Sequence, residues 1–323
     1  MIVRACAAAV VGFALLVTAG CRRDGSAPAD GRTAVWIDLS PSYGDPARDP
    51  GDALALLQAY GSGVLSVRGV SVTYGNVPLV RGYPVAHELM KRIDSGLLRP
   101  WRGASTPEER AAPTEATELL EEALSQQPLT ILALGPVTTV ASVLQRQPGL
   151  AARIDRIVLV GGRAAGAPPG VSPGSSSSTS HLDEDREGLR TLLDTPVDIT
   201  LVAPDLASGL GFDAGDLDRL EDARGPIRLV LPSARAWLQA ETDGAGTTAF
   251  AVPALLAVDV AAHPGSIRCE PAVATLPTAP GEPAVIVSGE PGATGRQVTW
   301  CHTADAGARD RIIADLMRLG PLH

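Results

Sequence analysis

Clustered positive charge is missing from this sequence of 323 residues. The net charge is −9, and Lys and Arg nowhere form a run denser than the pair Arg22-Arg23. A protein that binds nucleic acid needs basic clusters to neutralise the phosphate backbone. The sequence therefore predicts no nucleic-acid partner.

Aromatic residues are also scarce, at 3%, and neither an internal repeat nor a clean domain boundary divides the chain. Hydrophobic residues nevertheless make up 45% and charged residues 20%, which is ordinary for a globular protein. This composition excludes disorder of the whole chain and supplies apolar material for one large core or two small ones.

The N-terminus carries an apolar run that is too short to span a membrane comfortably. "MIVRACAAAVVGFALLVTAGC" has one early cation, then the apolar run, then small residues before Cys21, and "VTAGC" resembles a bacterial lipobox. We predict a signal peptide over residues 1–21, lipidation of Cys21, a flexible tether over 22–33 and one folded domain over 34–323. The expected product is an exported, membrane-anchored lipoprotein of the bacterial cell envelope. Ordinary signal cleavage and an uncleaved anchor are the alternatives.

Cysteine is rare outside this segment. Only Cys269 and Cys301 remain after the signal peptide. In an oxidising compartment a leftover pair favours a disulfide over a metal or catalytic pair. We predict a bridge between Cys269 and Cys301 that ties the last strands together.

Apolar runs of strand length alternate with amphipathic helical stretches along the rest of the chain. The runs are 34–38, 65–75, 129–135, 154–162 and 197–204. Strands that are apolar throughout and alternate with helices indicate an α/β fold with a mostly parallel central sheet and helices on both faces. A helix is also expected to start at "TPEE" (106–109), which reads as a capping box with Pro at the first position.

Four carboxylates follow the first predicted strand: Asp38, Asp45, Asp49 and Asp52. Ligands of parallel sheets bind outside the carboxyl ends of the strands, where the loops converge. The segments "TYGNV" (73–77), "LGPVTT" (134–139) and "VGG" (160–162) follow other strands at the same edge. This edge is the predicted ligand site.

These blocks, in this order, resemble the inosine-uridine-preferring nucleoside hydrolases over roughly residues 34–260. The resemblance implies a nucleoside-hydrolase-like fold and hydrolysis of the N-glycosidic bond of ribonucleosides. It also implies a Ca²⁺ ion that binds the ribose hydroxyls and a water, and a carboxylate that takes the proton of that water. A hard dication with six to eight oxygen ligands suits such a site.

Four positions of the family motif are retained. Asp38 matches its first Asp, and Asp52 matches its last, which ligates calcium. Asn76 matches a ribose-contacting Asn, and Thr138 matches the Thr whose carbonyl completes the calcium shell. The resemblance thus implies a catalytic and metal role for Asp38, a metal role for Asp52 and Thr138, and substrate binding by Asn76.

The rest of the acidic loop departs from the motif D-x-D-P-G-x-D-D. In one alignment Ser40 stands in place of the second Asp and Gly51 in place of the penultimate one. In the other, "DPGD" makes Asp49 the second Asp, with a catalytic and metal role. Either way one carboxylate is missing or displaced.

The second half departs further. Thr179, Ser180 and His181 stand where the family has E-F-N, which grips the sugar, and Pro253 and Ala254 replace its His and its calcium-binding Asp. His181 is the remaining substrate-binding candidate there. Because calcium affinity falls with the number of charged ligands, we predict that calcium binding is weak or absent.

Plainer roles compete with these assignments. Asp52 could cap or charge the start of a helix, Asp45 and Asp49 could be turn residues, and His181 could be a solvated side chain or one with satisfied hydrogen bonds. Three functions stay open: an exported N-ribosyl hydrolase of weak activity, a lipoprotein that binds a nucleoside or sugar without turnover, and a scaffold lipoprotein. The sequence does not give the oligomeric state.

Overall fold

The computed structural model describes residues 31–93, 98–167, 180–279 and 281–320. The predicted signal peptide, Cys21, most of the tether and Thr179 lie outside the described residues. Within the described part, no helix combines the length and the apolar character that a membrane span requires.

A ten-stranded sheet forms the centre of the molecule, in the order β3-β2-β1-β4-β5-β7-β12-β10-β11-β6. Nine strands run in one direction, and only β10 pairs antiparallel with both neighbours. The strands are β1 (Thr33–Leu39), β2 (Leu65–Val72), β3 (Trp101–Arg102), β4 (Leu129–Ala133), β5 (Ile154–Val160), β6 (Arg163–Ala164), β7 (Ile199–Val202), β10 (Ile267–Thr275), β11 (Ile286–Ser288) and β12 (Arg296–Ala304). The predicted mostly parallel sheet is confirmed.

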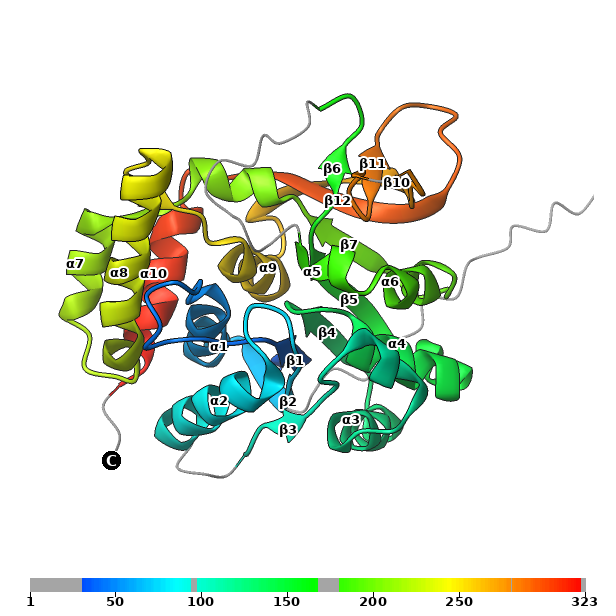
Figure 1. Ribbon diagram of the computed structural model, residues 1–323, viewed down its shortest axis with the longest axis horizontal. Coiled ribbons are helices and arrows are strands. Elements are labelled where there is room, and N and C mark those ends of the chain that lie inside the picture. The colour runs from blue at the N-terminus through cyan, green and yellow to red at the C-terminus, as the bar shows by residue number, and fades with distance from the viewer. Residues whose placement is uncertain (1–30, 94–97, 168–179, 280, 321–323) are drawn as a thin grey trace, which may run out of the picture.

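Helices cover both faces of this sheet (Figure 1). One face carries α1 (Gly51–Gly61), α2 (Leu79–Ile93), α9 (Pro253–Ala262) and α10 (Ala308–Arg318), with α7 (Ala214–Glu221) and α8 (Ile227–Ala245) packed further out. The other face carries α3 (Glu115–Gln126), α4 (Thr138–Arg146) and α6 (Arg186–Leu193). The remaining elements are α5 (Ser180–Glu184), the 3₁₀ helices η1 (Pro107–Ala111), η2 (Pro148–Arg153) and η3 (Pro204–Gly209), and the small pair β8 (Phe212–Asp213) and β9 (Ala249–Phe250).

Alternate side chains of β1 enter two separate cores. Val35, Ile37 and Leu39 pack under α1 and α9, whereas Ala34 and Trp36 pack under the helices of the other face. All five are buried. Since both faces of the strand need apolar side chains, the strand reads as a continuous apolar run and not as an alternating one.

A short helix begins at "TPEE" as predicted, with Pro107 at its start, but the predicted capping box does not form. Residues 107–111 form a 3₁₀ turn, and the Thr106 side chain makes no capping hydrogen bond. The Glu109 carboxylate instead accepts from the backbone N–H of Ser105 at 2.7 Å. The true capping box lies a few residues later, where Thr114 and Thr117 cap α3 reciprocally.

A break at Asp185 separates α5 from α6. α5 ends at Glu184, and Asp185 then caps α6 by accepting from the backbone N–H of Gly188 at 2.8 Å. Asp is a favoured N-cap because its carboxylate satisfies a backbone donor of the first turn. The division brings Asp185 to the edge of the sheet where the site lies.

Cys269 and Cys301, the pair predicted from the sequence, form a disulfide between β10 and β12. The two residues are directly opposite in the antiparallel register, with Cα atoms 4.0 Å apart. The bridge therefore holds the one antiparallel strand to the parallel part of the sheet.

Candidate functional site

Asp38 lies near the carboxyl end of β1 and is completely buried. Its Oδ1 accepts from the hydroxyl of Ser71 at 2.5 Å and from that of Thr139 at 3.3 Å. Its Oδ2 is buried and has no hydrogen-bond partner among the described residues. Burial raises the pKa of Asp38 to about 7, although the two hydroxyl donors act in the opposite direction.

A second donor fixes the orientation of Ser71. The indole Nε1 of Trp36 donates to Ser71 Oγ at 2.8 Å. Because Ser71 has one hydroxyl hydrogen and Trp36 can only donate, that hydrogen points to Asp38. The fully packed core around Trp36 thus sets which oxygen of Asp38 stays unpaired.

Asp52 is buried in the first turn of α1. Its carboxylate does not cap that helix, since the residue before the helix is Pro50 and no side-chain cap forms. Asp52 Oδ2 instead accepts from the backbone N–H of Ser40 at 2.7 Å. Burial raises the pKa of Asp52, and the charge of His181 opposes this rise.

The other two aspartates of the loop, Asp49 and Asp45, lie in different surroundings. Asp49 Oδ1 accepts from the backbone N–H of Gly51 at 2.7 Å, and the Asp49 carbonyl accepts from Asn76 Nδ2 at 2.7 Å. Asp45 pairs with Arg81 at 2.8 Å on the outside of the loop, where Arg81 is more than half exposed. Asp49 and Asn76 therefore lie at the site, whereas Asp45 does not join it.

Thr138 opens α4 and belongs to a buried polar network. Its hydroxyl donates to Asp185 Oδ2 at 2.6 Å, so the Tyr74 hydroxyl, 2.9 Å away, must donate to Thr138. Asp185 Oδ1 forms an ion pair with Arg110 from η1. The network joins loops that follow β2, β3 and β4, and a hollow of about 240 Å³ lies beside it, lined in part by Arg110, Glu184 and Asp185.

His181 lies in α5 with its side chain 9% exposed. Its ring occupies space that Gly75 leaves open, because a Cβ on Gly75 would stand only 2.9 Å from His181 Nδ1. Burial is the largest effect and lowers the pKa of His181, but hydrogen bonding and charge from the neighbouring Glu184 carboxylate, with the charges of Asp52 and Asp49, outweigh burial, and the pKa is raised. His181 is therefore a buried and not a solvated side chain, and the charges of Asp49 and Asp52 act on its ring.

The residues present do not fit a calcium shell of the expected kind. Calcium takes six to eight oxygens, several of them from carboxylates. Within the described residues, no three or more His, Cys, Asp and Glu side chains are grouped so that they could hold a metal ion. Ala254, which the resemblance aligns with a carboxylate ligand, is buried in the first turn of α9 next to Pro253.

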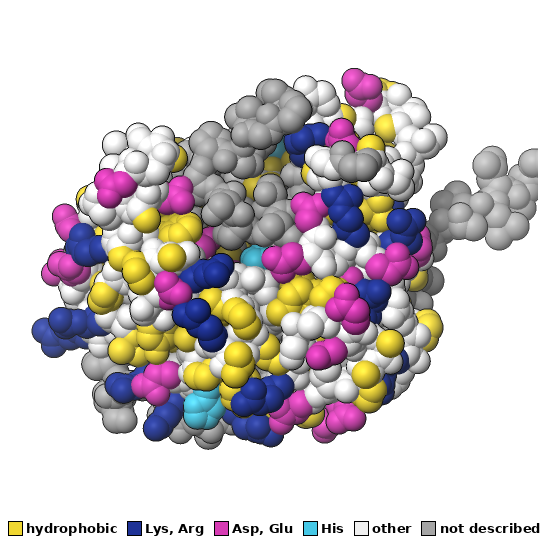
Figure 2. Space-filling model, viewed as in Figure 1, with side chains coloured by type: hydrophobic (Ala, Val, Ile, Leu, Met, Phe, Trp, Pro, Cys, Tyr) yellow, Lys and Arg dark blue, Asp and Glu magenta, His cyan; other side chains and the backbone are white. Residues whose placement is uncertain are grey.

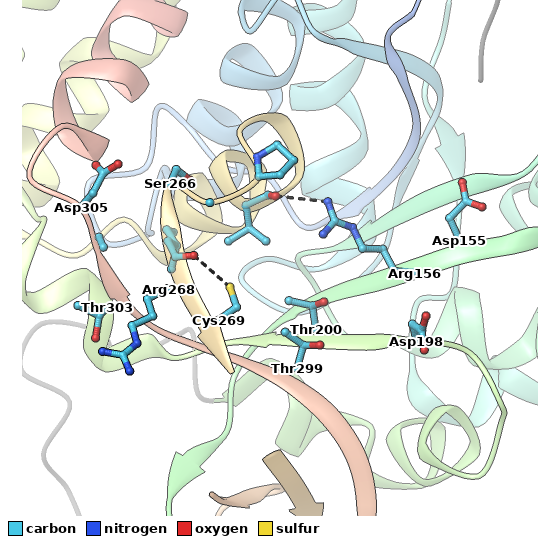
Figure 3. A pocket seen from close by; sticks show the side chains of 15 residues that line it. Asp155, Arg156, Asp198, Thr200, Ser266, Arg268, Cys269, Thr299, Thr303 and Asp305 are labelled. Carbon is cyan, nitrogen blue, oxygen red and sulfur yellow. Dashed lines mark hydrogen bonds between the residues drawn. The ribbon is translucent and has the colours of Figure 1, made fainter. Parts of the chain in front are cut away.

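A separate cavity of about 860 Å³ lies away from these residues (Figure 3). It opens where β5 and β7 begin, next to Asp155 and Asp198, and extends past Thr200 and Thr299 towards Cys269. The Arg156 guanidinium at its wall donates to the Val260 carbonyl at 3.3 Å. The candidate site lies instead where the strands end.

Sequence reasoning placed Asp38, Asp49, Asp52, Asn76, Thr138 and His181 at one edge of the sheet, and the structure brings all of them there. It missed Ser71, Thr139 and Asp185. Ser71 could have been found from "GVSVTYG", since a Ser inside an apolar parallel strand needs a partner. Asp185 could have been found as an N-cap, but its bond to Thr138 depends on the packing of α4 against α6.

A family model described as inosine-uridine preferring nucleoside hydrolase matches residues 35–309. The pyrimidine-specific ribonucleoside hydrolase RihA of Salmonella paratyphi C is 27% identical over 214 residues, which cover 58% of this chain and 67% of that protein. Uridine nucleosidase 1 of Arabidopsis thaliana is 26% identical over 207 residues, or 55% of this chain and 60% of that protein.

Solved structures show the same fold. A purine-preferring ribonucleoside hydrolase from Gardnerella vaginalis superposes with a TM-score of 0.75 at 16% identity, covering 89% of this chain and 99% of that one. The plant nucleoside hydrolase PpNRh1 gives a TM-score of 0.74 at 17% identity, covering 89% of this chain and 98% of that one.

Proposed function

Because the chain belongs to the inosine-uridine preferring nucleoside hydrolase family, we propose that it binds ribonucleosides at the carboxyl edge of its sheet and hydrolyses them slowly or not at all. We further propose that it is an exported lipoprotein anchored through Cys21, as the lipobox-like N-terminus indicates. The four retained motif positions, which are Asp38, Asp52, Asn76 and Thr138, support nucleoside binding. The missing acidic ligand at Ala254 supports the loss of turnover.

The observation that carries this proposal is the state of Asp38. Its Oδ2 is buried and unpaired within the described residues, and its pKa of about 7 matches the pH at which a general base is most effective. We therefore propose Asp38 as the group that accepts the proton of a water attacking the sugar carbon once a ligand opens access to Oδ2. We propose that Asn76, which lies against Asp49, and His181 contact the sugar hydroxyls, and a hollow lined in part by Arg110 and Asp185 supports a ligand at this edge.

Slow chemistry follows from the incomplete acidic shell. An oxocarbenium-like transition state is stabilised by nearby negative charge. Here Ala254 supplies none, and Asp38 is half protonated near neutral pH. We expect nucleoside binding to persist. Turnover should be at least 100-fold slower than in a site with the full set of acidic ligands, which corresponds to about 3 kcal/mol of lost transition-state stabilisation.

The test uses the full chain purified in detergent and titrated with uridine, cytidine, inosine and adenosine. Calorimetry measures binding, and chromatography measures released base and ribose. We expect a nucleoside to bind, with ribose release that is slow in the wild type and lost in Asp38→Asn. Asp45→Asn is the matched control, because Asp45 lies outside the site, and it should behave as the wild type. If no nucleoside binds and no ribose is released, the proposed function is wrong, and the scaffold lipoprotein is the function that remains.

A further inference from the structure

The cavity of about 860 Å³ at the opposite edge of the sheet has the size and polarity of a ligand site (Figure 3). Thr200 of β7 and Thr299 of β12, which are partners in the strand register, both line it. The turn that follows α9 lines another side. Sites for small molecules typically measure about 300–1,000 Å³, and hydroxyl and charged groups are what a polar ligand needs.

Arg156 is fixed at the wall of this cavity by a defect at the end of α9. Four residues after Val260 comes Pro264, which has no N–H, so the helix leaves the Val260 carbonyl without a donor. The Arg156 guanidinium supplies that donor at 3.3 Å. Arginine carries five N–H groups, so this bond holds the guanidinium in place and leaves donors for a ligand.

Arg156 and Asp198 lie side by side without neutralising each other. The backbone N–H of Ile157 donates to the Asp198 carbonyl at 2.8 Å, which places Arg156 and Asp198 next to each other at the start of β5 and β7. Both side chains line the cavity, but that of Arg156 extends towards the end of α9 (Figure 3). Within the described part of the chain, neither forms an ion pair. Burial lowers the pKa of Arg156, because it removes the charge from water.

The charged groups at the other end of the cavity are already paired. Arg268 forms an ion pair with Glu270, and Asp305 forms one with Arg311 at 3.0 Å. These side chains therefore offer little net charge to a ligand. The charges that lack a partner are gathered at the start of β5 and β7.

Ser266 adds an unused hydroxyl to the cavity. The residue is 6% exposed, and its Oγ is buried without a hydrogen-bond partner among the described residues. It lies in the turn after α9, two residues from Pro264, and lines the cavity together with Arg156. A buried hydroxyl without a partner is costly, so a ligand that accepts from it is favoured.

We propose that this cavity binds a small zwitterion, an amino acid or a short peptide, whose carboxylate is held by Arg156 and Ser266 and whose ammonium group is held by Asp198. The planar guanidinium matches a carboxylate, and a hydroxyl can donate to the same group. A neutral sugar would leave both charges without a counter-charge, and a simple anion would meet the carboxylates of Asp198 and Asp155. The inference does not depend on the proposed function, because the two sites lie at opposite edges of the sheet.

The test titrates the full chain in detergent with alanylalanine and measures the heat of binding. N-acetyl-alanylalanine lacks the ammonium group, and alanylalanine amide lacks the carboxylate. We expect alanylalanine to bind and each blocked form to bind at least about tenfold more weakly, because each loses a charged hydrogen bond. If the acetylated form binds as tightly as the free peptide, the zwitterion assignment is wrong.

Variants locate the binding in this cavity. Asp198→Asn and Arg156→Gln should each weaken alanylalanine binding at least about tenfold, and Ser266→Ala should weaken it less, because its bond carries no full charge. Asp194→Asn is the matched control, since Asp194 is exposed and lies outside the cavity, and it should bind as the wild type.

Asp198→Asn is the deciding variant. Arg156→Gln also removes the donor to Val260, so a weaker fold would confuse its result, whereas Asp198 is exposed and its melting temperature should match that of the control. Wild-type affinity in Asp198→Asn would overturn the inference. No heat from alanylalanine at millimolar concentration would overturn it as well.

Discussion

Among the described residues, Asp38 accepts hydrogen bonds through one of its two oxygens. The order Trp36 Nε1, Ser71 Oγ, Asp38 Oδ1 is fixed by donor and acceptor chemistry, and Thr139 adds a second donor to the same oxygen. Both hydroxyls favour the charged carboxylate, but burial is the larger effect and raises the pKa to about 7. A carboxyl group with a pKa of about 7 can both bind and release a proton near neutral pH.

This pKa predicts a pH-dependent stability. Between its unfolded value near 3.8 and its folded value near 7, Asp38 binds a proton more tightly in the folded chain. The contribution of Asp38 to the free energy of unfolding therefore falls as pH rises through that window, by up to about 1.4 kcal/mol per pH unit. Asp38→Asn cannot ionise, so its urea midpoint relative to wild type should rise between pH 4.5 and pH 8.

Asp45→Asn is the control for this measurement. The backbone N–H of Ala47 and the Arg81 guanidinium lower the pKa of Asp45, so its titration lies below pH 4.5. The difference between Asp45→Asn and wild type should stay constant over the same range. A constant difference for Asp38→Asn as well would show that Asp38 has an ordinary pKa.

At the scale of elements, short turns carry much of the site. Asp185 stands between α5 and α6, caps α6, and bonds at once to Thr138 and Arg110. Removing one partner of such a buried pair leaves a charge without compensation, which typically costs about 3–5 kcal/mol. The network therefore holds α4, α6 and η1 in one arrangement around the site.

The disulfide acts on a different pair of elements, β10 and β12. The bridged residues are 32 apart in sequence, and closing a loop of that length in the unfolded chain contributes about 4 kcal/mol in the chain-entropy model. We expect Cys269→Ser with Cys301→Ser to lower the melting temperature markedly. Dithiothreitol should lower that of the wild type and leave the double variant unchanged. A melting temperature insensitive to both changes would contradict the stabilising role.

At the scale of the whole molecule, the start of the fold and the candidate site lie at opposite edges. β1 begins at Thr33 and reaches Asp38 only near its other end, about 17 Å further along. The proposed tether between Cys21 and Thr33 spans at most about 40 Å when fully extended. A lipid at Cys21 would therefore attach the domain at the edge opposite the candidate site.

Fluorescence quenching tests this orientation. Ala152 is exposed in η2 just before β5, on the edge where strands begin, and Arg48 is exposed in the loop after β1. A fluorophore on Ala152→Cys should be quenched more strongly by a headgroup quencher in liposomes than one on Arg48→Cys. Equal quenching of the two labels would show that the anchored protein has no fixed orientation.

Charged side chains of both signs are mixed on the visible face of the molecule (Figure 2). Figure 2 shows Lys and Arg side chains interspersed with Asp and Glu side chains over the visible face, with hydrophobic side chains scattered between them. Neighbouring charges of opposite sign cancel within a Debye length. A phosphate backbone would find no continuous positive surface on that face.

The sequence by itself determined the fold class and the edge at which the site lies. Continuous apolar runs such as β1 and β4 reveal strands that are buried on both faces, and parallel strands bring their following loops to one edge. That logic placed Asp38, Asp52 and Thr138 together without any knowledge of distances. It also paired Cys269 with Cys301, because no other cysteine remained.

Only the tertiary structure decided what each carboxylate does. Whether Asp52 caps its own helix or receives the Ser40 N–H, and whether His181 meets solvent or the acidic loop, depends on contacts between segments far apart in the chain. Secondary-structure propensity depends on residues that are close in the sequence, so it does not predict such contacts. Burial, which raises the pKa of Asp38 and overrides its hydrogen bonds, is likewise a property of the packed molecule and not of the sequence around one residue.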